Sequence, residues 1–132
     1  MILVDTSAWI DFFRGSGKLA NEVSDLIDGD LATICGPIVT EIYRGTVRAK
    51  ERQSLEALLK GIPLLQQPET LWEDAGLLGA FIAKKGFTVK SFDLLIASYA
   101  IAADIALLTA DRDFNQMRKV GVPLRLYTGH RV

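Results

Sequence analysis

Short, uninterrupted apolar runs alternate with segments of helical periodicity, and this alternation constrains the fold more than any other feature. An apolar run with no polar residues between its members is typical of a strand that is buried on both faces of a sheet. Such runs predict strands at residues 1–5, 31–34, 62–66 and 105–108, with an edge strand at 124–127.

Between these runs, apolar residues recur at every third or fourth position, which predicts helices. Leu19, Val23 and Leu26 show this spacing in the first of them, and Gly36-Pro37 is typical of a helix start because proline is favoured in the first turn. The predicted helices cover residues 17–28, 36–45, 47–59, 69–85 and 92–103, and a short helix starts near residue 111.

Strands separated by helices imply right-handed crossovers and a mostly parallel central sheet with helices on both faces. The chain has 132 residues, 49% of them hydrophobic, and no low-complexity tract. A chain of this size buries roughly two thirds of its unfolded surface as one unit. We therefore expect one domain over residues 1–132, with an α/β fold in three layers, α/β/α.

Composition excludes several classes of protein. The apolar runs are far shorter than the ~20 residues of a membrane helix, and Asp5 and Asp11 within the first dozen residues argue against a signal peptide. Cys35, the one cysteine, has no partner for an intramolecular disulfide and is expected in the core. We expect a cytoplasmic protein with no membrane segment.

The net charge of −1 excludes nucleic-acid binding by bulk electrostatics, so any contact with a polyanion must be local. Basic residues gather in two groups. The first contains Arg44, Arg48, Lys50 and Arg52, and the second contains Lys84, Lys85 and Lys90. Each group is equally explained as a solvated helix face.

Four acidic residues follow the predicted strands. Asp5 ends the first strand, Glu41 lies in the helix after the second, Asp93 opens the apolar helix at 92–103, and Asp111 follows the last long strand. Because ligands of open parallel sheets bind at the carboxyl ends of the strands, we expect the four carboxylates at one rim of the sheet.

Each acid also has a structural explanation. Asp93 and Asp111 suit helix N-termini, and Asp5 suits a cap of the turn that follows it. Glu41 resists this explanation, because it would be the fifth residue of a helix that starts at Pro37, past the free N–H groups.

Four like charges at one rim repel, so they must bind protons or share a cation. Carboxylate oxygens suit Mg²⁺ or Mn²⁺, whereas zinc prefers Cys or His. A carboxylate-bound Mg²⁺ suits phosphodiester hydrolysis, because it activates water and offsets charge in the transition state. His130, the only histidine, is near the C-terminus and is expected to be exposed and non-catalytic, and no GxSxG elbow is present.

The segments that carry these acids match a known family. They are MILVDTSAWIDFF, ICGPIVTEIYRG, FDLLIASYAIA and LLTADRDF. In this order and at this spacing, the chain resembles the PIN-domain ribonucleases, and specifically the VapC-type toxins of type II toxin–antitoxin systems, over essentially its whole length. The resemblance implies a PIN-like α/β/α domain.

The resemblance also implies roles for individual residues. Asp5, Glu41, Asp93 and Asp111 match the family's four acidic active-site positions. Of these, Asp5 and Asp93 match the steadiest Mg²⁺ ligands, with Mn²⁺ able to substitute, while Glu41 and Asp111 would bind a second ion or orient water.

Three further positions would support the acids. Ser7 matches a small polar side chain near the metal, and Thr109 matches a hydroxyl that braces the acidic loop. Asp113 is an alternative to Asp111 as the fourth carboxylate. We prefer Asp111, with Asp113 supporting the helix N-terminus.

The implied activity is metal-dependent endoribonuclease cleavage that arrests translation. The implied partners are an RNA substrate and a VapB-type antitoxin that blocks the site, with operator DNA bound only through the antitoxin, and we expect a homodimer or higher complex. Apolar side chains in the helices at 17–28 and 47–59 would suit a groove for an amphipathic partner. Arg44, Arg48 and Lys50 would border the rim and contact RNA phosphates.

Two alternatives stay open from the sequence. One is a PIN-type nuclease subunit in RNA processing. The other is a non-catalytic, receiver-like phosphoacceptor, which would require an acid adjacent to Asp5 and a lysine soon after Leu108, whereas the next lysine is Lys119.

Overall fold

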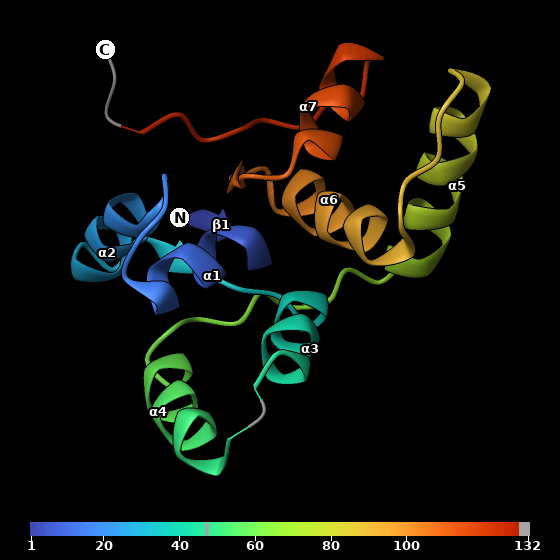
Figure 1. The fold of residues 1–132 in the computed structure, drawn as a ribbon. Coiled ribbons are helices and arrows are strands. Elements are labelled where there is room, and N and C mark those ends of the chain that lie inside the picture. Colours follow the sequence, from blue (N-terminus) through green and yellow to red (C-terminus); the bar gives the residue numbers. More distant parts are fainter. Residues whose placement is uncertain (47, 130–132) are drawn as a thin grey trace.

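The central sheet is parallel and has β1 in the middle. In the computed structural model, which describes residues 1–46 and 48–129, β1 (Ile2–Val4) pairs with β2 (Ala32–Thr33) on one side and with β3 (Ala106–Leu108) on the other (Figure 1). This order brings the first, second and fourth predicted strands together with the expected parallel pairing.

The predicted strands at 62–66 and 124–127 are largely wrong. Each is reduced to one parallel bridge, from Ile34 to Leu64 at one edge and from Leu107 to Leu126 at the other. Both segments lie at an edge and contain or directly follow a proline, Pro63 or Pro123, which carries no N–H for a longer ladder.

Seven helices connect or follow the described strands. The bounds are α1 (Thr6–Arg14), α2 (Ala20–Asp28), α3 (Gly36–Arg44), α4 (Ala49–Leu59), α5 (Leu71–Lys84), α6 (Ser91–Ala103) and α7 (Arg112–Lys119). The helices expected from periodicity are therefore present, and their ends coincide with the predicted ones or differ by up to three residues. The predicted start at Gly17 is too early, because Gly17 has φ +102° and lies in the loop before α2.

The helices form two layers around the sheet. The chain moves from β1 to β2 through α1 and α2, and then moves back past β1 to β3 through α3 to α6. Because parallel crossovers are right-handed, these two sets of helices cover opposite faces. In Figure 1, α1 and α2 lie together on the left, and α5 and α6 pack against each other on the right. The three-layer α/β/α arrangement is confirmed.

Helix α1 was not expected from the sequence. Ala8 and Trp9 on this helix are fully buried, and the ring of Phe12 meets that of Trp9 edge-on at 5.9 Å. Gly15 ends the helix with φ +67°, and its N–H donates to the carbonyls of Asp11 and Phe12. The signal was an apolar stripe at helical spacing that stops at a glycine.

The core lies along β1, β3 and α6. Leu3, Val4 and Leu107 are fully buried, and α6 is buried over most of its surface, as its composition predicts. Among the described residues, no helix is both long enough and apolar enough to cross a membrane. This packing fixes the carboxyl ends of β1 and β3 and the start of α6 beside one another.

Candidate active site

Asp5 is the most deeply buried acid of the site, with 3% of its surface exposed. It stands between β1 and α1, and its backbone carbonyl accepts hydrogen bonds from the N–H groups of Ala8 and Trp9 at 3.0 and 3.1 Å. Its side chain makes no capping hydrogen bond to α1. The interpretation of the Asp5 side chain as a turn cap is therefore wrong, and the carboxylate faces other partners.

Two hydroxyl groups hold that carboxylate. Ser7 Oγ donates to Asp5 Oδ2 at 2.9 Å, and Thr109 Oγ1 donates to the same oxygen at 2.7 Å. Burial raises the pKa of Asp5 above its ordinary value, while the hydroxyls of Thr109 and Ser7 act in the opposite direction and the charge of Glu41 adds to the increase. The two hydroxyls therefore stabilise the ionised Asp5 carboxylate and offset part of the cost of its burial.

The same hydroxyls join the ends of β1 and β3. Ser7 Oγ accepts the N–H of Ala110 at 2.9 Å, and Thr109 Oγ1 accepts the N–H of Asp111 at 3.0 Å. The Asp5 N–H donates to the Leu108 carbonyl at 2.9 Å. Asp5 and the loop that carries Asp111 are consequently bound to each other, at the rim where the strand order predicts them.

Asp93 lies in the first turn of α6 and is 7% exposed, and the charges of the other acids affect its pKa. Burial is the main cause that raises its pKa to about 7, and the charges of Asp111, Asp5, Glu41 and Asp113 raise it further, in that order. Coulombic effects of this kind require nearby charges. The charges of the other three predicted acids therefore all act on Asp93.

Asp113 belongs to the same cluster. One carboxylate oxygen from each of Asp93, Asp111 and Asp113 lies within 4.8 Å of the other two. Asp111 Oδ1 also caps α7 by accepting the N–H of Asp113 at 2.9 Å, which leaves the second oxygen of Asp111 for other contacts. Both aspartates are near Asp93, so the choice between them as fourth carboxylate stays open.

Glu41 approaches the cluster from α3. That helix starts at Gly36, so Glu41 is its sixth residue, one position later than expected and likewise past the capping positions. Its Oε1 accepts a hydrogen bond from Thr6 Oγ1 at 2.7 Å. Thr6 was not predicted as a site residue, although the hydroxyl pair Thr6-Ser7 directly after Asp5 was a visible signal.

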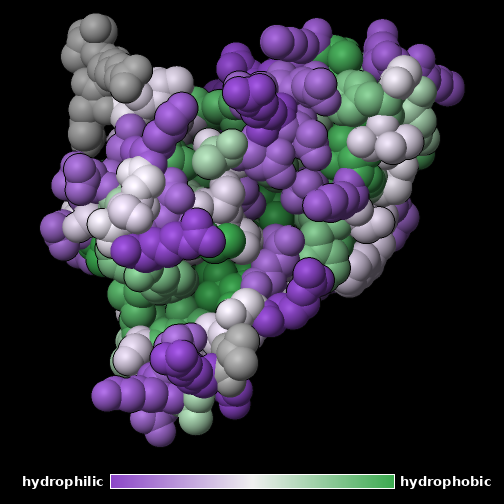
Figure 2. Space-filling model, in the orientation of Figure 1, coloured by the Kyte–Doolittle hydropathy of each residue, from purple (hydrophilic) through white to green (hydrophobic). Residues whose placement is uncertain are grey.

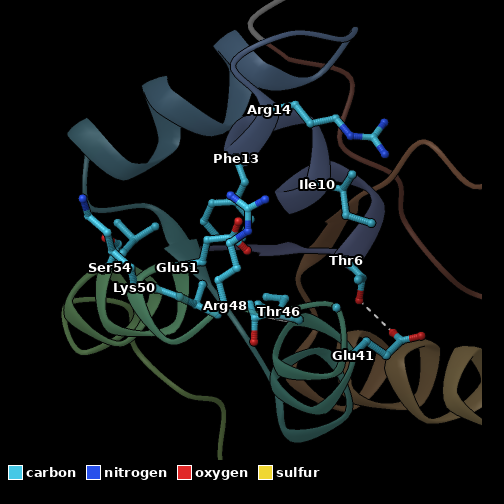
Figure 3. A pocket seen from close by; sticks show the side chains of 14 residues that line it. Thr6, Ile10, Phe13, Arg14, Glu41, Thr46, Arg48, Lys50, Glu51 and Ser54 are labelled. Atoms are coloured by element: carbon cyan, nitrogen blue, oxygen red, sulfur yellow. Dashed lines mark hydrogen bonds between the residues drawn. The ribbon is translucent and has the colours of Figure 1, made fainter.

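A groove of about 900 Å³ opens beside Glu41, between α1, α3 and α4 (Figure 3). Apolar side chains gather in the hollow between α1 and α4 (Figure 2). The apolar lining residues are Ile10, Phe13, Ile42, Leu55 and Leu58, and the charged ones are Arg14, Glu41, Arg48, Lys50 and Glu51. In Figure 3, Thr6 and Glu41 lie at one end of the groove, and Lys50 and Ser54 lie at the other.

The groove differs in part from the sequence prediction. Helix α4 contributes to it as expected, but α2 does not, because Val23 and Leu26 are buried within the fold. Arg48 and Lys50 are exposed and line the groove, whereas Arg44 is exposed in the last turn of α3 and is not a lining residue.

Comparison with known proteins identifies the family. The family model described as "PIN domain" matches residues 2–120. The chain belongs to the PIN-domain family. Within it, the chain groups with VapC ribonucleases. It is 34% identical over 125 residues to "VapC ribonuclease Mb1587" of Mycobacterium bovis and to "Ribonuclease VapC11" of Mycobacterium tuberculosis, covering 91% of this chain and 93% of each relative.

Solved structures show the same PIN-domain fold. A chain of VapBC2 from Rickettsia felis, solved bound to a promoter DNA fragment, has a TM-score of 0.77 at 23% identity, over 96% of this chain and 98% of that one. A chain of VapBC-1 from nontypeable Haemophilus influenzae has a TM-score of 0.74 at 21% identity, over 96% and 97%. The receiver-like alternative is thus excluded by family and by fold.

The donor atoms of this PIN domain suit a hard cation. Over residues 1–46 and 48–129, the one ion pair joins Arg125 to Asp104 at 3.1 Å, so no Lys or Arg neutralises the clustered acids by a salt bridge. Burial raises the pKa of Cys35 to about 12, which keeps its thiol neutral and unsuited to zinc. His130 lies outside the described residues. Carboxylate and hydroxyl oxygens remain, and these are the ligands that Mg²⁺ and Mn²⁺ prefer.

Proposed function

We propose that this PIN-domain protein is a Mg²⁺-dependent endoribonuclease and the toxin of a toxin–antitoxin pair, and that its cleavage of RNA arrests translation. The observation that carries the proposal is the cluster in which one carboxylate oxygen from each of Asp93, Asp111 and Asp113 lies within 4.8 Å of the other two. The charges of Asp5 and Glu41 also contribute to raising the pKa of Asp93. Nuclease activity is also supported by the 34% identity to proteins named VapC ribonucleases.

Asp5, Glu41, Asp93 and Asp111 would hold Mg²⁺, with Mn²⁺ able to substitute, and Asp113 is the alternative to Asp111. When bound, the ion lowers the pKa of a water molecule and offsets negative charge on the scissile phosphate. Ser7 and Thr109 keep the Asp5 carboxylate in place through Oδ2, which leaves Oδ1 free of both hydroxyls. Fixed orientation of a ligating carboxylate raises metal affinity, because less freedom is lost on binding.

RNA phosphates would be contacted by Arg44, Arg48 and Lys50. Arg48 and Lys50 line the groove that has Glu41 at its other end, which supports an approach of the RNA backbone along this surface. The net charge of −1 argues that these local cations, rather than the whole molecule, attract the polyanion.

The apolar groove supports a VapB-type antitoxin as partner. Its walls expose Ile10 and Phe13, at 42% and 45%, which is unfavourable in water and suits the apolar face of a helix. Because the net charge of −1 does not favour binding to duplex DNA, operator binding would occur only through the antitoxin, in a cytoplasmic complex.

Self-association is supported by a second apolar surface. Trp72 and Leu77 on α5 are 62% and 69% exposed, and Phe81 is 39% exposed. Leu77 and Phe81 are four residues apart and share one face of α5, whereas Trp72 is exposed on another side of the same helix. Exposed apolar and aromatic side chains of this kind are typical of interfaces. We therefore propose a homodimer or higher complex through α5.

The activity is tested by incubating the purified protein with single-stranded RNA in Mg²⁺ and in EDTA. We expect cleavage only in Mg²⁺, and none by Asp5→Asn or Asp93→Asn, both of which should remain folded by circular dichroism. Asp25→Asn, which changes an exposed acid of α2, should cleave normally. An Asp5→Asn protein that cleaves at the parental rate would refute the proposal.

The alternative is a PIN-type nuclease subunit in RNA processing. The exposed groove indicates that a partner binds there but does not identify this partner. A cell-growth assay therefore distinguishes the two functions. A toxin should arrest growth when expressed alone and should be neutralised by the protein encoded in a short neighbouring reading frame. A processing nuclease should do neither. Parallel assays on flap DNA test for a deoxyribonuclease.

A further inference from the structure

Thr6 makes a hydrogen bond that joins two helices at the edge of the acidic cluster. It is the first residue of α1, and its Oγ1 donates to Oε1 of Glu41 on α3 at 2.7 Å, across 35 positions of sequence (Figure 3). A hydroxyl that donates to an ionised carboxylate forms a stronger hydrogen bond than one between neutral groups.

We propose that Thr6 is a positioning residue, which holds Glu41 in the orientation that presents its second oxygen, Oε2, to the metal ion. This inference rests on the proposed metal-dependent function. It adds a residue whose side-chain hydroxyl acts through Glu41.

Glu41 needs such a partner because of its length and its position. A glutamate side chain loses considerable rotamer freedom when it is ordered. Glu41 is only half-buried and lines an open groove, so packing alone does not restrict it. With Oε1 bound to Thr6, the remaining oxygen has a defined direction before an ion arrives.

The hydroxyl of Thr6 is available because of where α1 begins. A threonine inside a helix usually donates back to a carbonyl one turn earlier. Thr40 does so within α3, where its Oγ1 donates to the Gly36 carbonyl at 3.3 Å. Thr6 follows Asp5, which has an extended backbone (φ −70°, ψ 159°), so no helical turn precedes it.

Adjacent residues thereby serve two different acids. Ser7 donates to Asp5 at 2.9 Å, and Thr6 donates to Glu41 at 2.7 Å. The first turn of α1 therefore orients one carboxylate at the end of β1 and another on α3. The carboxylates of Asp5 and Glu41 are thus both held by hydroxyls of two adjacent residues.

The test measures Mn²⁺ binding by titration calorimetry, together with RNA cleavage as a function of Mn²⁺ concentration. Loss of a group that orients a metal ligand typically lowers affinity or activity by about 10–100-fold. We expect Thr6→Val to weaken Mn²⁺ binding at least about tenfold, and Thr6→Ser to bind like the wild type. Thr40→Val, which removes a hydroxyl bonded only to backbone, is the matched control and should bind normally.

A double-variant comparison separates positioning from general damage. In a Glu41→Ala background, Thr6→Val should have no additional effect on Mn²⁺ affinity, because its only route to the ion is gone. If Thr6→Val does not fold, Thr6→Ala is measured in its place.

Three results would overturn the inference: unchanged Mn²⁺ affinity in the variant that lacks the hydroxyl, a Thr6→Ser protein as weak as Thr6→Val, or an equal loss in the Glu41→Ala background. These results differ from failure of the proposed function, in which the wild type itself would neither bind Mn²⁺ nor cleave RNA.

Discussion

Asp93 stores unfavourable free energy in the metal-free protein. Its pKa rises from an ordinary value of 3.8 to about 7, first because of burial and then because of the surrounding acids. Each pKa unit corresponds to about 1.4 kcal/mol of differential interaction between the two protonation states. The site therefore favours either a proton on Asp93 or a cation beside it.

The first prediction concerns stability against pH in EDTA. The folded state holds a proton on Asp93 up to about pH 7, whereas the unfolded chain releases it near pH 4, so the free energy of unfolding falls as pH rises between these values. Asp93→Asn removes this dependence. We expect the variant to exceed the wild type by on the order of 2–4 kcal/mol at pH 8 and by clearly less at pH 5.

Urea unfolding at the two pH values measures this difference, and Asp25→Asn serves as the exposed control. Saturating Mg²⁺ should stabilise the wild type and leave Asp93→Asn nearly unchanged, because the ligand stabilises only the protein that binds it. Equal stabilities of wild type and variant at pH 8 would show that Asp93 is not strained.

The second prediction concerns Thr109, whose hydroxyl donates to Asp5 and accepts the Asp111 N–H. Thr109→Val keeps the shape but removes these two hydrogen bonds, one of them to a charged group, and also the 3.2 Å contact with Ser7 Oγ. We expect a loss of roughly 1.5–3 kcal/mol at pH 8, measured by urea unfolding. Thr109→Ser should retain most of the stability. A valine variant as stable as the wild type would exclude the bracing role.

At the scale of elements, apolar patterns in the sequence predicted the helices and strands that are most buried. Helix α6 and strands β1 and β3 were recognised because their apolar composition reflects extensive burial. Helix α1 was missed because its apolar stripe follows that of β1 almost directly, so no turn signal separated strand from helix. The edge segments were overestimated, since their residues favour a strand but their prolines interrupt the ladder.

The acidic site was also predictable only in part. Topology alone brings Asp5 and Asp111 to one edge, and the spacing of Glu41 excluded capping. The contact between Thr6 and Glu41 depends on how α1 packs against α3, which no local pattern specifies. The sequence therefore indicated which carboxylates meet, but not which hydroxyls orient them.

The third prediction compares two glycines that differ in backbone conformation, one in the left-handed region and one inside a helix. Gly15 ends α1 with φ +67°, where an added Cβ meets no atom within 4 Å, so Gly15→Ala should cost about 1 kcal/mol through backbone strain alone. Gly76 lies inside α5 and is equally open, so Gly76→Ala should stabilise by roughly 0.5–1 kcal/mol. Thermal unfolding measures both, and shifts of the same sign would contradict this account of α1.

Over the whole molecule, a net charge of −1 means that RNA affinity depends on a few cations. The fourth prediction uses an Asp93→Asn background to prevent cleavage. Replacing Arg44, Arg48 and Lys50 with alanine should weaken binding and lower the slope of log affinity against log salt by about 0.7 for each phosphate that is no longer neutralised. Lys84→Ala with Lys85→Ala, from the second basic group, should leave the slope unchanged. Fluorescence anisotropy measures both slopes, and equal slopes would refute this binding surface.

Two apolar surfaces at separate ends of the molecule imply two different partners. The groove lies between α1 and α4, whereas helix α5, which carries the exposed Leu77, lies on the other side of the fold (Figure 1). The fifth prediction separates them with Leu58→Glu, a half-buried groove residue, and Leu77→Glu, which is 69% exposed on α5.

A charge placed in an apolar groove must be desolvated when a partner helix binds, so Leu58→Glu should weaken antitoxin binding far more than RNA cleavage, since the proposed phosphate contacts are made by Arg48 and Lys50 and not by Leu58. Cells that express this variant together with the antitoxin should stop growing, while cells with Leu77→Glu should be rescued by the antitoxin and contain a toxin of smaller assembly size. Copurification, growth curves and light scattering measure these outcomes. If the antitoxin neutralises Leu58→Glu as well as the wild type, the groove is not its binding site, and the inhibitory contact must lie on another surface near the acids.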